Sequence, residues 1–191
     1  MFYLIDAKDI VRITPKQIEE NLEENILIEI ENKNIGRIIE CKNGKGAIVA
    51  IKEIKEIGEG KIIYEDPGVY FDVRFTAIVS IPKIQEVVEG EVKSIKSFGA
   101  FIDLGTFDGF CHISQLFDDY VSFDEANRMF NGKETGISLK EGDKVKARIV
   151  SLSPKSTIVE TKIGLTMRQP FLGKPEWMNV KKDEKKEGKE K

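Results

Sequence analysis

The sequence predicts two small domains in succession, an α+β domain over residues 1–82 and an all-β barrel over residues 83–176. Three observations predict this division. A strand-like segment near the N-terminus leads into a capped helix, and a later segment of alternating residues ends at Pro82. Beyond that proline, the chain changes to short apolar runs separated by glycines. Because proline cannot donate to a strand ladder, we place the domain boundary at Pro82.

The first domain begins with a strand, Phe2–Ile13, followed by a helix that runs to about Glu31. Thr14 can cap the free backbone N–H groups of the first turn, Pro15 suits the first helical position, and Gln17 can complete a capping box. Apolar residues then recur every four positions, which predicts one apolar stripe on a helix: Ile18, Leu22, Ile26 and Ile30.

The middle of this domain admits two interpretations. Isoleucines recur every three residues over 47–57, a spacing compatible with a helix, whereas the density of β-branched residues favours a strand. We predict a strand there and a short second strand over 61–64. Turn signals flank that short strand at Gly58-Glu59-Gly60 and Asp66-Pro67-Gly68. Strict alternation over residues 69–81 predicts the last strand.

The second domain contains five short strand patterns, which fit a small closed barrel such as an OB-fold. They are Gly90–Ile95, Gly99–Leu104, Phe107–Ile113, Lys144–Ser151 and Lys162–Met167. A long insertion, Ser114–Asp143, separates the third from the fourth. Residues 177–191 are rich in lysine and glutamate without an apolar anchor, so we expect a charged mobile tail.

Composition excludes several classes of protein. Hydrophobic residues make up 40% and charged residues 33%, as in a globular domain. No apolar run approaches the roughly 20 residues of a membrane span, and the N-terminus lacks the layout of a secretory signal, so we expect a cytoplasmic protein without membrane partners. Cys41 and Cys111 lie too far apart to indicate a disulfide framework or a zinc site. The net charge of −3 means that nucleic-acid binding would depend on local placement of charges.

The barrel strands predict a mixed aromatic and basic outer surface. A small barrel fills its interior with the aliphatic set of each alternating strand. That leaves Phe101 outward on one strand, and Phe110 and His112 outward on the next. It also leaves the cations of a further strand outward: Lys144, Lys146 and Arg148. Rings that stack on bases, with cations along the phosphates, are typical of single-stranded nucleic-acid binding.

Ordinary structural roles for the same residues stay open at this point. Phe98 and Phe101 could be packing aromatics, His112 a structural hydrogen-bonding group, and the three cations a solvated strand face. Catalysis has less support. The single histidine has no serine or cysteine nucleophile arranged around it, and Gly58-Glu59-Gly60 lacks the length and the lysine of a phosphate-binding loop.

Four blocks of the second domain resemble an S1 RNA-binding domain in their order and spacing. They are Gly90-Glu91-Val92, residues 97–102, residues 109–114 and residues 142–145. The resemblance implies an S1-type OB-fold in which Phe98, Phe101 and His112 form the RNA-facing patch. Two further patch positions of such domains, usually an Asp and an Arg, correspond here to Ser153 and Lys162.

A narrower resemblance covers nearly the whole chain. Residues 118–124, 132–136 and 165–170 resemble the family of E-prime subunits of archaeal RNA polymerases, the counterparts of the seventh-largest subunit of eukaryotic RNA polymerase II. The resemblance implies a truncated ribonucleoprotein-like first domain whose tip docks on the polymerase core. That tip corresponds to the two turns Gly58-Glu59-Gly60 and Asp66-Pro67-Gly68.

The same resemblance implies a division of labour within the polymerase. The chain would form a heterodimer with a small helical partner, the F subunit of RNA polymerase, as a polymerase stalk, and its barrel would hold the emerging single-stranded RNA. Polymerisation and its magnesium belong to the two largest subunits, so we expect no catalytic residue, metal ligand or cofactor in this chain. The alternative is an S1-domain component of an RNA-decay or translation complex. Such proteins usually follow the barrel with another folded module, whereas a short charged tail follows it here.

Overall fold

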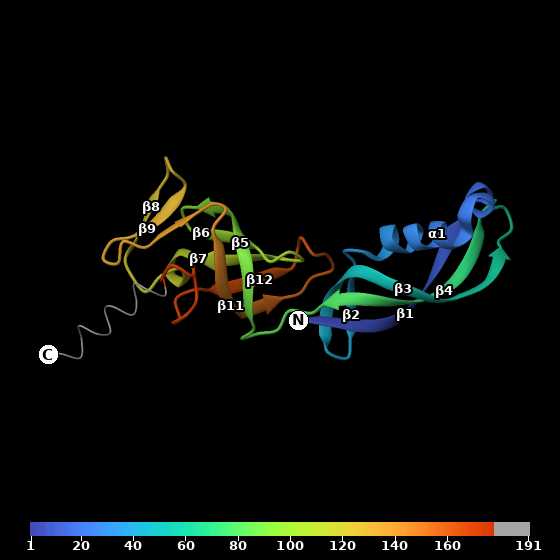
Figure 1. Cartoon of the computed structure of the whole chain (residues 1–191), viewed down its shortest axis with the longest axis horizontal. Coiled ribbons are helices and arrows are strands. Elements are labelled where there is room, and N and C mark those ends of the chain that lie inside the picture. The colour runs from blue at the N-terminus through green and yellow to red at the C-terminus, as the bar shows by residue number, and fades with distance from the viewer. Residues whose placement is uncertain (178–191) are drawn as a thin grey trace. The chain divides into compact units, whose positions relative to one another are not determined.

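The computed structural model describes residues 1–177, which divide into two compact units (Figure 1). Unit 1 comprises Met1–Pro82 together with Ser156–Ile158. Unit 2 comprises Lys83–Lys155 and the chain from Val159 onward. No helix within residues 1–177 is long and apolar enough to cross a bilayer.

Unit 1 is a four-stranded antiparallel sheet in the order β1-β4-β3-β2, with helix α1 along one face (Figure 1). Its elements are β1 (Phe2–Ile13), α1 (Pro15–Asn34), β2 (Ile38–Cys41), β3 (Gly44–Ile62) and β4 (Val69–Ser80). The predictions of β1, of the helix start and of the alternating last strand are confirmed. Strand β2 was not predicted, because four residues are too few to display a period.

The isoleucines spaced by three lie in strand β3, and irregular pairing explains their spacing. Ile48, Ile51, Ile54 and Ile57 pair with Val79, Ala77, Phe75 and Val73, so three residues of β3 advance for every two of β4. Each repeat contains a register shift, as in a β-bulge, where one strand carries an extra residue. The repeated extra residue keeps all four isoleucines on the face that packs against the core.

Strand β3 also corrects part of the prediction. It continues through Gly58 and Gly60 to Ile62, so the expected turn at Gly58-Glu59-Gly60 and the separate strand over 61–64 are wrong. Gly60 pairs with Phe71, and a Cβ built there would lie 2.8 Å from Val69 Cγ1 and 3.0 Å from the Phe71 ring. Glycine at this position therefore serves close packing inside the sheet rather than a chain reversal.

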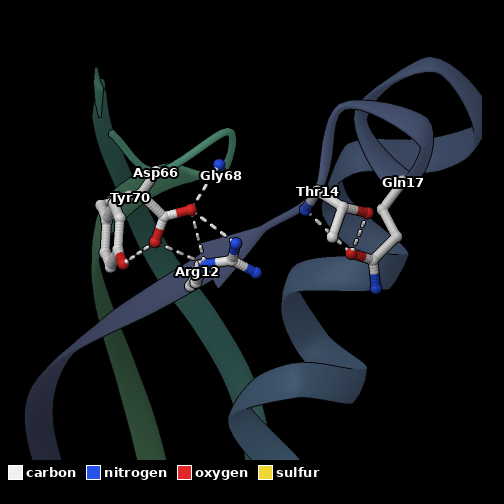
Figure 2. Close-up of polar contacts among 6 residues, drawn as sticks. All are labelled: Arg12, Thr14, Gln17, Asp66, Gly68 and Tyr70. Carbon is white, nitrogen blue, oxygen red and sulfur yellow. Dashed lines mark hydrogen bonds and ion pairs between the residues drawn. The ribbon is translucent and has the colours of Figure 1, made fainter. Parts of the chain in front are cut away.

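Helix α1 begins at the predicted capping box and is then interrupted. Gln17 Oε1 accepts hydrogen bonds from the Thr14 backbone N–H (2.9 Å) and hydroxyl (2.7 Å), as Figure 2 shows. Asn21 leaves helical geometry (φ −158°, ψ 101°), and its Oδ1 accepts from the Glu24 N–H at 3.4 Å, which caps a second helical segment. The predicted single stripe is therefore carried by two segments, and the helix ends at Asn34 instead of Glu31.

The core of unit 1 lies between this helix and the sheet. Ile26 and Ile30 of α1 are fully buried against the strands, and Ile18 and Leu22 are partly buried around them. The largest buried ring is that of Phe75 on the central strand β4. This core excludes water from the face of the sheet that lies against α1.

Unit 2 is built around a closed five-stranded barrel in the order β11-β12-β7-β6-β5. The strands are β5 (Val87–Lys96), β6 (Gly99–Asp103), β7 (Asp108–His112), β11 (Lys144–Ser153) and β12 (Lys162–Thr166), which confirms the predicted barrel. A 3-10 turn, η1 (Ile113–Gln115), follows β7. The insertion forms a separate three-stranded sheet of β8 (Val121–Asp124), β9 (Met129–Gly132) and β10 (Ser138–Lys140), which was not predicted.

The chain after β12 returns to the barrel. Gly173 forms two backbone hydrogen bonds with Lys146, and Trp177 is buried with its ring edge-on to Phe117 at a centroid distance of 5.0 Å. Trp177, the first residue of the predicted mobile tail, is therefore packed. The remainder of that prediction, residues 178–191, lies outside the described residues.

Two isoleucines on α1 offer a matched test of this core. Ile30 is fully buried, whereas Ile28 is 44% exposed. We expect Ile30→Ala to lower the free energy of unfolding by about 2–5 kcal/mol, because it leaves a cavity in a close-packed interior. Ile28→Ala should change it by about 0.5 kcal/mol or less. Urea unfolding followed by circular dichroism measures both, and equal effects would contradict the described helix orientation.

Candidate functional site

Four rings gather on the outer surface of the barrel, and we call them the aromatic cluster: Phe98, Phe101, Phe110 and His112. Phe110 lies at its centre, with ring centroids 5.1 Å from Phe101, 5.7 Å from Phe98 and 6.4 Å from His112. Phe98 and Phe101 meet edge to face at 6.3 Å. Phe98 is 52% exposed and His112 is exposed, so a ligand can reach the rings from solvent.

Strand register brings these rings together. Phe101 of β6 pairs directly with Phe110 of β7, and two residue pairs further along the same strands, Gly99 faces His112. Phe98 lies in the tight turn that joins β5 to β6. The residues between the rings, Ala100 and Cys111, are fully buried in the barrel. Because successive side chains of a strand alternate between its faces, the aliphatic interior sets the rings outward.

Gly99 makes room for the central ring. A Cβ built on Gly99 would lie 2.8 Å from two carbon atoms of the Phe110 ring and would collide with the carbonyl oxygen of Cys111. Any larger residue would therefore displace Phe110 from its position between Phe98 and Phe101. In the strand register, Gly99 lies between Lys96 and His112, which are both exposed.

His112 is held by the turn that follows it. Its Nδ1 lies 2.9 Å from the Ser114 hydroxyl and accepts from the Ser114 backbone N–H at 3.3 Å. A neutral ring held in this way carries its proton on Nε2, which can then donate. Behind the cluster, burial raises the pKa of the Cys111 thiol to about 12, so this cysteine stays protonated and unreactive.

The predicted cationic residues are not brought to the aromatic cluster by the strand register. Lys144 and Lys146 of β11 pair with Glu91 and Glu89 of β5, and Lys146 forms a 3.0 Å ion pair with Glu89. Arg148, half-buried, pairs with Val87 and Thr166, and its Nε has no hydrogen-bond partner among residues 1–177. These three side chains thus line the β5–β11 side of the barrel, where the lysines lie beside acids.

In the strand register, Lys162 and Lys96 lie nearer to the aromatic cluster than the three predicted cations do. Lys162 shares a face of β12 with Gly164, and Gly164 pairs with Phe110. Lys96 is separated from His112 only by Gly99. Alternation predicted that Phe110 points outward with His112, although the S1 resemblance did not name Phe110 in the RNA-facing patch. Lys96 was not predicted, because its place beside Gly99 depends on the register of the tight turn.

The predicted docking residues divide between a strand and a turn. Gly58, Glu59 and Gly60 lie inside β3, whereas Asp66, Pro67 and Gly68 lie in the turn between β3 and β4. We call residues 62–68 the tip turn. It begins with three exposed apolar side chains: Ile62 (79% exposed), Ile63 (51%) and Tyr64 (90%). Sequence reasoning missed them, because it assigned this segment to a strand of its own.

One carboxylate organises the tip turn, as Figure 2 shows. Asp66 accepts hydrogen bonds from Arg12 Nε (2.9 and 3.1 Å) and Nη2, from the Tyr70 hydroxyl (2.6 Å) and from the Gly68 N–H (2.8 Å). These donors, Arg12 first and then Tyr70 and Gly68, hold the pKa of Asp66 well below its ordinary value of 3.8. The turn is thereby tied to the end of β1, where Arg12 lies.

Among residues 1–177 there is no group of three or more His, Cys, Asp or Glu side chains placed to hold a metal ion. Two exposed groups of side chains stand out among the described residues, the aromatic cluster of unit 2 and the tip turn of unit 1. Stacking, hydrogen bonding and apolar contact are the interactions that these surfaces offer.

Two family models match the chain. The S1 RNA binding domain matches residues 81–162, and the SHS2 domain found in the N terminus of Rpb7p and Rpc25p matches residues 8–67. The first match contains the barrel strands that carry the aromatic cluster. The second contains most of the unit 1 sheet and the greater part of the tip turn.

Known proteins similar to this chain include RNA polymerase subunits and a nucleotidyltransferase. The chain is 25% identical over 130 residues to subunit RPC8 of DNA-directed RNA polymerase III from Bos taurus, covering 68% of this chain and 62% of that protein. It is 31% identical over 125 residues to polyribonucleotide nucleotidyltransferase of Bacteroides fragilis, but this covers only 16% of the nucleotidyltransferase. It is 38% identical over 182 residues to DNA-directed RNA polymerase subunit Rpo7 of Saccharolobus shibatae, covering 95% of this chain and 99% of that subunit. The chain therefore belongs to the Rpo7 family, the non-catalytic subunits of DNA-directed RNA polymerase that carry an S1 RNA-binding domain.

Proposed function

We propose that this polymerase subunit docks on the polymerase core through its tip turn, pairs with the small helical F subunit, and holds the emerging single-stranded RNA on its aromatic cluster. The observation that carries the proposal is the exposed, pre-packed cluster of three phenylalanines and one histidine on the barrel. The chain would act in the cytoplasm, where transcription takes place in a cell without a nucleus.

Stacking is the main contribution that we expect to RNA binding. A base stacked on an aromatic side chain contributes about 1–3 kcal/mol, and every base has a face to offer, so sequence preference should be slight. The cations at the cluster are few, Lys96 and Lys162, whereas Lys144 and Lys146 lie beside acids on another side of the barrel. Because salt dependence follows the number of phosphates neutralised, we expect only a modest salt dependence.

Docking on the core is supported by the chemistry of the tip turn. Three consecutive exposed apolar side chains are costly in water unless a partner covers them. The Asp66 hydrogen bonds fix the turn before binding, so little conformational entropy is lost on docking. The apolar residues would enter a complementary pocket on the core, with the Arg12–Asp66 pair supporting them from the sheet.

The alternative function, an S1 component of an RNA-decay or translation complex, has narrower support. The similarity to the nucleotidyltransferase covers a small part of that protein, whereas the similarity to Rpo7 covers both chains almost completely. A decay or translation role would also not explain why the tip turn of unit 1 exposes three apolar side chains.

The RNA-binding role can be tested by removing rings. We expect Phe101→Ala with His112→Ala to weaken binding of a single-stranded oligoribonucleotide at least roughly fivefold, because about 1–3 kcal/mol is lost with each stacked base. Tyr120→Ala is the control, since Tyr120 is 75% exposed but lies outside the cluster. Fluorescence anisotropy at low salt measures the affinities. An unchanged affinity in a folded double variant would mean that RNA binds elsewhere.

The docking role can be tested at the tip turn. We expect Ile62→Asp with Tyr64→Ala to reduce association with the core enzyme while RNA affinity stays unchanged, because a charge would have to enter an apolar pocket. Val159→Asp is the control, because Val159 is 95% exposed in unit 2. Co-elution with core polymerase in gel filtration is the measurement, and full co-elution of the tip variant would contradict this docking surface.

The tip turn should also show a specific acid sensitivity. The pKa of Asp66 is lower in the folded chain than its ordinary value of 3.8, so its contribution to stability is complete above that pH and is lost as the pH falls further. We therefore expect Asp66→Asn to lower the melting temperature at neutral pH, and the difference from wild type to narrow below pH 3.8. Glu65→Gln is the neighbouring control. A pH-independent difference would mean that the carboxylate charge does not stabilise the turn.

A further inference from the structure

Strand β1 lies at the outer edge of the unit 1 sheet, and its hydrogen-bonding direction can be assigned residue by residue. Met1 and Ile81 exchange two backbone hydrogen bonds, from the Met1 amino group (3.2 Å) and to the Met1 carbonyl (2.9 Å). In an antiparallel pair, residues alternate between both groups facing the partner strand and both facing away. In the unbroken β1–β4 register, odd-numbered residues of β1 therefore bond to β4, and even-numbered residues point outward.

One outward position is closed by side chains. The Ile10 N–H donates to Asp9 Oδ1 at 2.8 Å, and the Ile10 carbonyl accepts from Lys33 Nζ at 2.7 Å. Lys33 also pairs with Asp9 at 2.9 Å, so the two side chains form a fixed cap on this part of the edge. Charged side chains over an edge are a known means of preventing strands from pairing there.

The rest of the edge is open. Within residues 1–177, the outward backbone groups of the even-numbered residues from Phe2 to Lys8 have no hydrogen-bond partner. Beside this open edge lie two exposed apolar side chains, Phe2 (64%) and Leu4 (59%), on the sheet face opposite α1. A chain that closes its edge at Ile10 and leaves it open over Phe2–Lys8 presents a template for one short strand.

We infer that the open edge Phe2–Lys8 receives an extended segment of the small partner subunit, which adds a fifth strand to the sheet. This inference rests on the proposed pairing with that subunit and locates it. The Asp9–Lys33 cap limits the added strand to the first part of β1 and so fixes its register. Backbone hydrogen bonds give such strand addition its affinity, and alternate side chains give its specificity.

The exposed side chains define the chemistry of the incoming segment. Apolar residues would face Phe2 and Leu4. Further along, Asp6 already forms an ion pair with Lys55 (2.7 Å) and Lys8 forms one with Asp72 (3.4 Å). The positions facing them therefore need only avoid a like charge, because like charges directly opposite in a sheet are destabilising. The segment therefore has two alternating apolar positions, followed by one position that is not acidic and one that is not basic.

Proline scanning of the edge tests the inference with a matched control. Leu4→Pro removes one outward N–H and leaves the β4 hydrogen bonds in place, a position where proline is tolerated in edge strands. Ile10→Pro makes the same change at the capped position. We expect Leu4→Pro to weaken binding of the purified small subunit at least roughly tenfold, and Ile10→Pro to leave it unchanged. Isothermal titration measures the affinities, and circular dichroism confirms that both variants are folded.

Amide hydrogen exchange gives a second readout that does not require a variant. In the free chain, the amides of Leu4, Asp6 and Lys8 should exchange quickly and those of Ile5 and Ala7 slowly. Addition of the small subunit should slow the even-numbered set selectively. Unchanged exchange of that set, or equal binding by Leu4→Pro and wild type, would overturn the strand addition while leaving the heterodimer intact.

Two other outcomes are distinguishable. If the wild-type chain does not bind the small subunit at all, the proposed pairing and the inference fail together. If the free chain dimerises in sedimentation velocity and Leu4→Pro abolishes the dimer, the edge takes a second copy of this chain, which overturns the proposed occupant.

Discussion

The pairing of β4 with two unlike neighbours is the constraint on which unit 1 depends. On one edge it meets β1 in unbroken register, and on the other it meets the longer strand β3 through four register shifts. Extra residues on one strand increase its local twist and bend. The sheet can therefore wrap around α1 on its buried face, while β3 reaches Ile62 with its last side chains exposed. At this end Ile62 pairs with Val69, the first residue of β4, so the tip turn connects two strand ends that are still paired.

In the barrel, the corresponding constraint is the buried aliphatic interior. Ala100, Ile102 and Cys111 are fully buried, and their alternation with Phe101 and Phe110 leaves no choice about where the rings point. The absence of a side chain at Gly99 then allows the central ring to lie against the strand. The surface that we propose for RNA is thus determined by residues that RNA would not touch.

Much of this fold could be predicted from the sequence, because most of its strands and the start of its helix carry local signals. The alternation in β4, the capping box at Thr14 and the short apolar runs of the five barrel strands are such signals, and the structure confirms the elements that they predicted. The continuity of β3 through two glycines was not predicted, because glycine signals a turn in isolation and only the adjacent Phe71 and Val69 reveal its packing role. On the barrel, the outward rings were predicted, but the positions of the cations relative to them were not. The alternation of a strand shows which residues point outward. Only the strand register shows that Lys144 and Lys146 lie opposite Glu91 and Glu89, and that Lys96 and His112 flank Gly99.

The three-against-two pairing of β3 and β4 has a consequence for how such a sheet can change in length over evolution. A lone inserted or deleted residue in β3 would rotate every isoleucine beyond it out of the core. A change of three residues in β3 keeps the phase of the core only when β4 changes by two, and β1, which follows β4 residue for residue, must then change by two as well. Length variation in this domain should therefore occur as coupled changes in three strands, or be confined to the tip turn where no phase has to be kept.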